Sequence, residues 1–144
     1  MKPWSVLLGI ALLQACAPAP EPIRFGEETC VYCRMGIADP RYGAEIVTRT
    51  GRVYKFDALE CMIAFEDAGE VDSAQVHSRW VVDFAQPGQL IRLEEAEFVF
   101  APEVPSPMGL NVYAVKRSAS REGLPPGQPV SWAQVVQMAR RASP

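Results

Sequence analysis

The fold is decided by residues 45–69, EIVTRTGRVYKFDALECMIAFEDAG. The first part places β-branched and aromatic residues on both sides of Thr50-Gly51, which is typical of a β-hairpin. From Asp57 onward, apolar residues recur at helical spacing on two faces, which predicts a largely buried helix ending at Gly69. Glu60 stands at the third helical position, as in a capping box, so we expect the Asp57 side chain to cap this helix.

Beyond the helix, Trp80-Val81-Val82-Asp83-Phe84 supplies a further strand on which the helix can pack. Asp83 is expected to be a polar residue at the end of this strand rather than an acid catalyst. Residues 23–86 therefore form a first half with the order strand, strand, helix, strand.

Residues 87–144 repeat this pattern loosely. Ser131 is expected to cap a final helix that carries Trp132, Val135, Val136 and Ala139 at helical spacing. Ser118 to Pro129 is rich in Gly, Pro and Ser, which indicates a loop. The strand-like segments of the second half are Leu90 to Leu93, Glu97 to Phe100 and Leu110 to Val115. Two small halves fit this pattern better than one β-sandwich, so the predicted class is α+β.

The composition excludes several classes of function. The 144 residues include 14 Lys+Arg, 17 Asp+Glu and one histidine, with 49% apolar residues, so the chain should fold but has no basic footprint for nucleic acid. A single histidine makes His-based catalysis or a His-rich metal site a poor prediction. No phosphate-binding loop or Ser/His/Asp set is present, so we expect no enzymatic activity.

The N-terminal residues have the layout of an export signal. Met1 and Lys2 precede an uncharged apolar run, and Leu13-Gln14-Ala15-Cys16 resembles a bacterial lipobox. We expect cleavage of residues 1–15 and lipid attachment at Cys16; the alternative is an ordinary signal peptide with an incidental cysteine. Residues 16–22 contain three prolines and should form an extended tether. The protein is thus expected on the periplasmic or extracytoplasmic side of a bacterial membrane, anchored but not spanning it.

Sulfur chemistry is concentrated at Cys30-Val31-Tyr32-Cys33-Arg34-Met35. Two cysteines at this spacing can meet at one point, and Met35 can project to the same side as Cys33. Thiolate and thioether ligands together select a soft cation, of which Cu(I) best accepts methionine sulfur. The alternatives are a structural disulfide for the two cysteines and core packing for Met35. Arg34 at the position of a histidine excludes covalent c-type haem attachment.

Met108 is the second unusual methionine, since it stands between Pro107 and Gly109 after two further prolines. A large apolar side chain on such a loop either covers the core or has a chemical role. Met108 becomes a candidate ligand if this loop approaches the CxxC.

Two further residues are weaker candidates as metal ligands. Cys61 lies in the predicted helix, where burial in the core is the simpler interpretation. His77 lies before a strand and is more simply a surface residue. Together with Cys30 and Cys33 these residues would form a zinc site.

At this point the motifs in order resemble the NosL family: a lipobox, a Pro-rich tether, Cys30-x-x-Cys33-x-Met35, Tyr54-x-Phe56-Asp57 leading to Cys61-Met62, Val82-Asp83-Phe84, and Ser106-Pro107-Met108-Gly109. NosL proteins are membrane-anchored periplasmic copper proteins that assist maturation of nitrous oxide reductase. The resemblance implies two small ββαβ-like halves and a Cu(I) site built from Cys33 or Cys30 and Met108. The chain departs from the family after Val115, where a Pro/Gly-rich stretch replaces a helix, so a reduced second half is expected.

The sequence therefore predicts a Cu(I) metallochaperone with Cys30, Cys33, Met35 and Met108 as ligands. Its expected partner is nitrous oxide reductase or another exported copper enzyme, with a membrane transporter complex as a further candidate. A thiol-disulfide protein that uses the CxxC and a zinc-stabilised structural module are the alternative functions.

Overall fold

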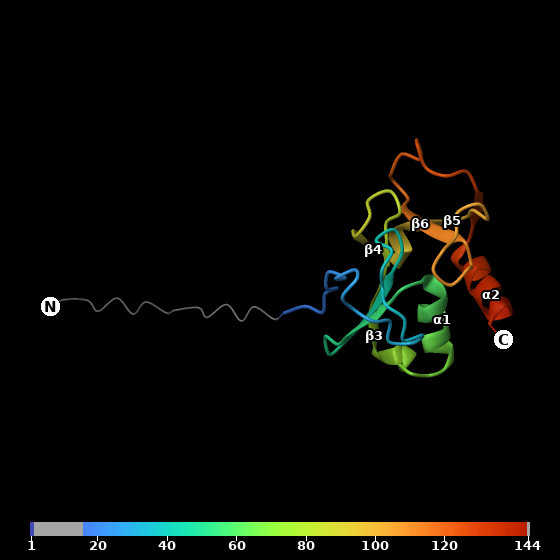
Figure 1. Cartoon of the computed structure of the whole chain (residues 1–144). Helices are drawn as coiled ribbons and strands as arrows, with labels where there is room; N and C mark the ends of the chain where they lie inside the picture. Colours follow the sequence, from blue (N-terminus) through green and yellow to red (C-terminus); the bar gives the residue numbers. More distant parts are fainter. Residues whose placement is uncertain (2–15, 144) are drawn as a thin grey trace.

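The computed structural model describes Met1 and residues 16–143, so nearly all of the predicted signal peptide lies outside the described residues. The described chain forms two small antiparallel sheets and two α-helices, which confirms the α+β class with two halves (Figure 1). Two short 3₁₀ turns complete the order: β1 (Ala44–Thr48), β2 (Val53–Phe56), α1 (Leu59–Asp67), η1 (Ser73–Gln75), β3 (Val76–Val82), β4 (Leu90–Arg92), η2 (Leu93–Glu95), β5 (Ala96–Phe100), β6 (Val112–Lys116), β7 (Gln128–Val130) and α2 (Trp132–Ala142).

The first sheet has the strand order β2-β1-β3-β4. The predicted hairpin is confirmed: β1 pairs with β2 in the register Ala44↔Phe56, around the tight turn that contains Gly51. β3 begins at Val76, four residues before the predicted strand. β4 pairs with β3, so the first sheet continues beyond residue 86, where we divided the two halves.

The second sheet has the strand order β6-β5-β7 and is followed by α2. Ser131 caps α2, as predicted, and Gln134 completes a capping box. The prediction of a loop up to Pro129 is wrong for β7, which pairs with β5. Pro129 is tolerated because β7 is an edge strand. A side chain at Gly127 would approach the Phe100 carbonyl oxygen to 2.5 Å, so glycine allows this close pairing.

Both halves contribute to the main apolar core, and a smaller second cluster includes Phe84 and Tyr113. Helices α1 and α2 lie against each other, as Figure 1 shows in green and red. Just past β3, the Phe84 N–H donates to the Ala114 carbonyl on β6 at 2.8 Å, which joins the two sheets. Buried side chains from both halves, including Met62, Phe98 and Val135, pack in a single cluster. The helix that follows the hairpin is therefore held in place from both sides.

Residues 16–22 have no regular secondary structure, but the end of this segment contacts the first sheet. The Glu21 N–H donates to the Glu45 carboxylate at 3.1 Å, and the Lys55 ammonium donates to the Pro22 carbonyl at 3.1 Å. Within the described residues, no helix is long and apolar enough to cross a membrane.

Candidate metal centre

The CxxC segment is a tight loop attached to β2. The Cys30 N–H donates to the Met35 carbonyl at 2.8 Å, and the Arg34 N–H donates to the Cys30 carbonyl at 3.1 Å. Arg34 takes φ 66°, a left-handed conformation that favours glycine. The Val31 N–H donates to the Lys55 carbonyl, so the loop is fixed beside the hairpin.

Helix α1 starts differently from the prediction. Its N-cap is Ala58, with no side-chain cap hydrogen bond, so the prediction that Asp57 caps the helix is wrong. The Asp57 carboxylate instead accepts hydrogen bonds from the Cys33 thiol at 3.4 Å and the Cys61 thiol at 3.3 Å. The structure thus places Asp57, only 4% exposed, among the cysteines.

Four side chains converge at this point. The thiols of Cys30, Cys33 and Cys61 and one Asp57 carboxylate oxygen all lie within 4.8 Å of one another. Cys30 and Cys61 are buried, whereas Cys33 is only half-buried. All three cysteines are free thiols. Hence the cluster is open to the surroundings on the Cys33 side.

The three thiols of the cluster differ in pKa: that of Cys30 is lowered, and those of Cys33 and Cys61 are raised. The neighbouring Cys61 thiol, helped by backbone N–H groups, lowers the pKa of Cys30 to about 6 although burial opposes this shift. Burial is the main cause that raises the pKa of Cys33 to about 11. The pKa of Cys61 is raised too, because its proton is shared with Cys30 and the thiol is buried. Of the three thiols, Cys30 is therefore favoured to lose its proton first.

The Met108 loop approaches this cluster. Ser106 and Asn111 exchange hydrogen bonds across the loop, at 3.0 and 2.9 Å, and fix its shape. The Leu110 N–H donates to the Glu60 carboxylate on α1 at 2.8 Å. A hollow of about 390 Å³ is bordered by the two loops and the cluster; its lining includes Met35, Asp57, Ser106 and Pro107.

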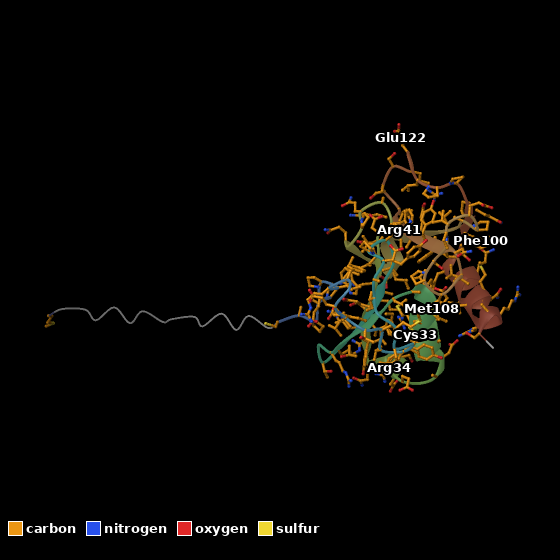
Figure 2. All side chains as sticks on the ribbon, viewed as in Figure 1. Cys33, Arg34, Arg41, Phe100, Met108 and Glu122 are labelled. Carbon is orange, nitrogen blue, oxygen red and sulfur yellow. The ribbon has the colours of Figure 1, made fainter. Side chains whose placement is uncertain are left out.

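Both candidate thioethers lie at the surface. Met35 is 57% exposed and Met108 is 43% exposed. In Figure 2, Met108 and Cys33 are seen on the same side of the molecule. The structure thus places both methionines on loops that border the opening of the cluster, while the thiols form its inner part.

Two other polar residues named from the sequence lie outside the cluster. His77 is exposed on β3, where its Nδ1 atom lies 3.1 Å from the Ser78 hydroxyl, and it is not among the converging side chains. Asp83 is buried, and its carboxylate accepts a hydrogen bond from the Ala85 N–H at 3.0 Å. This bond satisfies a backbone N–H just after β3 ends.

Sequence reasoning missed Asp57 as a possible donor and Glu60 as the residue that holds the Met108 loop. One signal for Asp57 was present, because residues four apart on a helix share a face and Asp57 is four residues before Cys61. The contact between Glu60 and Leu110 spans 50 residues and had no local signal.

A hollow of about 570 Å³ lies elsewhere, between β5, β7 and the start of α2. Phe98, Pro129 and Trp132 line it together with the ion pair of Arg121 and Glu97. It contains no sulfur donor, so its chemistry does not match that of the cysteine cluster.

The NosL family model matches residues 23–123, which is more than half of the chain and includes the cluster and the Met108 loop. The chain belongs to the NosL family. Membership in this family of accessory proteins indicates a copper-binding accessory role, and the cluster of three cysteines and Asp57 can hold a metal ion. No curated protein and no solved structure matches the chain significantly.

Proposed function

We propose that this NosL protein is a Cu(I) metallochaperone whose cargo is bound by the thiols of Cys30, Cys33 and Cys61. The observation that carries this proposal is the convergence of three free thiols within 4.8 Å of one another, with an opening at Cys33. Thiolates and thioethers are the ligands that select Cu(I) over harder cations. The low pKa of Cys30 supplies the first anionic donor.

Met35 and Met108 act as outer ligands in this proposal. Met35 lines the hollow beside the cluster, and Met108 directly follows Pro107, which also lines it. Both thioethers are exposed, so they can bind an incoming ion and hold it together with the buried thiols. A neutral thioether binds Cu(I) without adding charge, and a mixed site therefore releases the ion more readily than thiolates alone. Delivery follows by ligand exchange, in which an acceptor donor binds before a resident sulfur leaves.

A zinc site is the second candidate, and Asp57 is the observation that favours it. A carboxylate oxygen beside three thiols gives four donors of the kind that zinc binds in tetrahedral geometry. In the copper proposal Asp57 instead accepts hydrogen bonds from the Cys33 and Cys61 thiols and orients them before Cu(I) replaces their protons. A thiol-disulfide function of the CxxC accounts for neither the third thiol nor the two methionines.

The cellular setting is a second part of the proposal. NosL proteins are typically extracytoplasmic, and Cys16 is exposed at the start of the Pro-rich segment. We place the protein on the outer side of a bacterial membrane, attached through acyl chains on Cys16, with nitrous oxide reductase or another exported copper enzyme as its client. Cys16→Ala should abolish cleavage and membrane fractionation; a wild-type mature protein that starts elsewhere and lacks lipid would contradict this.

The metal is tested by anaerobic titration of the reduced protein with Cu(I) and with Zn(II), followed by native mass spectrometry. We expect one Cu(I) per chain, retained when Zn(II) is present in excess. Retention of zinc with displacement of copper would favour the structural zinc site.

A further inference from the structure

The exposed large apolar side chains of the folded part belong to the two loops beside the metal centre. Among residues 16–143, the large apolar side chains that are exposed are Tyr32, Met35 and Met108. All three come from the two loops that border the cysteine cluster. Their position on the loops of a candidate functional site makes them candidates for contact with another molecule.

A basic hollow adjoins this apolar surface. It has a volume of about 430 Å³ and lies on the side of the CxxC loop where β2 and α1 meet. Arg34 and Arg52 both line it, next to the Tyr32 and Tyr54 rings. The Arg52 guanidinium lies over the Tyr54 ring, 4.6 Å from its centroid, and is therefore held in place.

Neither arginine is neutralised within the described chain. No carboxylate of residues 16–143 lies within 4.0 Å of the guanidinium of Arg34 or Arg52, although Glu70 stands at the border of the same hollow. Arg41, on the other side of the cluster, is by contrast paired with Asp39 at 2.7 Å. The hollow thus presents two cations that are available to an external anion.

The backbone conformation at Arg34 also supports a role for its side chain. Its φ of 66° favours glycine, so the turn alone does not account for an arginine at this position. The residue follows Cys33 directly and its side chain is exposed. The loop geometry therefore does not account for the cation that directly follows Cys33.

We propose that Tyr32, Met35 and Met108 form a docking face for an acidic protein partner, and that a carboxylate of this partner binds between Arg34 and Arg52. The proposal rests on the copper carrier function, because it assigns the partner's position during ligand exchange. Arginine binds carboxylates through two parallel hydrogen bonds, which orient as well as attract the partner. The partner's copper ligands then face Cys33 across the apolar surface.

The docking face is tested with three synthetic peptides that share a methionine-based Cu(I) site and differ only in flanking aspartate, asparagine or lysine. In NMR titrations of the reduced, metal-free protein, the aspartate peptide should shift the amide signals of Tyr32, Arg34 and Arg52. The lysine peptide should bind about tenfold more weakly, and high salt should remove the difference. Equal binding of the three peptides would overturn the proposal.

Variants assign this preference to the two arginines. Arg34→Glu and Arg52→Glu should each abolish the preference for the aspartate peptide. Arg34→Gly keeps the fold, because glycine favours the left-handed turn, and should lose the preference as well. Arg49→Glu is the matched control: Arg49 is exposed on the same hairpin, with its guanidinium bonded to the Ala74 carbonyl, and should keep the preference. An equal loss in Arg49→Glu would overturn the assignment.

A second arm follows Cu(I) transfer from loaded protein to the same peptides. Transfer to the aspartate peptide should be faster than to the lysine peptide in wild type and lose this advantage in Arg34→Glu. A protein that retains no Cu(I) would contradict the copper function, whereas the NMR titration still tests the docking face. Binding to phosphatidylglycerol vesicles that depends on both arginines, without any peptide preference, would assign this surface to a membrane instead.

Discussion

The carboxylate of Glu60, near the start of α1, accepts a 2.8 Å hydrogen bond from the backbone N–H of Leu110. This contact ties the loop that carries Met108 to the helix that carries Cys61. Its length and the partial burial of both groups make it a defined connection rather than a surface contact. The relative position of thioether and thiols in this NosL protein therefore depends on one side chain that is itself no metal ligand.

Removal of this connection should loosen the Met108 loop. Glu60→Ala leaves the Leu110 N–H without its acceptor, at a cost of about 1–2 kcal/mol in the free energy of unfolding. Glu60→Gln keeps an acceptor oxygen and should cost less. Amide hydrogen exchange of Leu110 reports the difference; equal protection in wild type and Glu60→Ala would show that the loop is held by other contacts.

Asp57 distinguishes the two candidate metals. Asp57→Asn preserves the volume and an oxygen acceptor for the thiols but removes the anionic donor. If Cu(I) is held by sulfur, its affinity should change little, whereas Zn(II) affinity should fall by about tenfold or more. Asp83→Asn is the control, since Asp83 is a buried carboxylate outside the cluster. A loss of Cu(I) affinity as large as that of zinc would make Asp57 a ligand in both complexes.

The fold should persist without metal. The hairpin, α1 and the shared core with α2 are complete without a bound ion, so circular dichroism should be the same before and after chelation. Cys33→Ser should cost little stability because Cys33 is half-buried, whereas Cys30→Ser buries a hydroxyl at 0% exposure and should cost about 1–2 kcal/mol. Unfolding on chelation would indicate a structural metal.

Glu45 should make stability depend on pH. Burial raises the pKa of this fully buried carboxyl from 4.5 to about 7, although the Glu21 N–H and Lys55 oppose the shift. Folding then favours the protonated form, so the wild type loses stability as pH rises from about 4.5 to 7. Glu45→Gln should therefore be more stable than wild type by roughly 3 kcal/mol at pH 8 and nearly equal to it at pH 4.

Chemical denaturation at both pH values measures this effect, with the exposed Glu103→Gln as control. The same stability difference between Glu45→Gln and wild type at pH 8 and pH 4 would mean that folding does not shift the pKa of Glu45.

The elements with strong local patterns could be predicted from the sequence. The alternation around Gly51 and the capping box at Ser131 are local signals, and both elements occur where expected. β7 was missed because the rule against proline in strands is relaxed at a sheet edge, which only the pairing with β5 reveals.

The candidate site was predictable in part. The CxxC and the Pro107/Gly109 frame of Met108 drew attention to the two loops from composition alone. The two loops approach each other because Glu60 binds the Leu110 N–H. Cys61 and Asp57 join the cysteine cluster because α1 packs against the hairpin. Such contacts between segments distant in sequence have no periodic pattern. The sequence favours a capping role for Asp57, because a helix cap and a thiol contact use the same side-chain oxygen.

X-ray absorption at the copper edge of the Cu(I)-loaded protein tests the central claim, that one Cu(I) is held jointly by the cysteine cluster and Met108. Met108→Leu is close in volume and lacks sulfur, so stability should stay within about 1.5 kcal/mol. The account predicts fewer or altered copper–sulfur contacts and weaker Cu(I) binding in this variant, and neither change in Met138→Leu on α2. Identical spectra and affinity in wild type and Met108→Leu would contradict the joint site and leave the copper with the cysteines, with or without Met35.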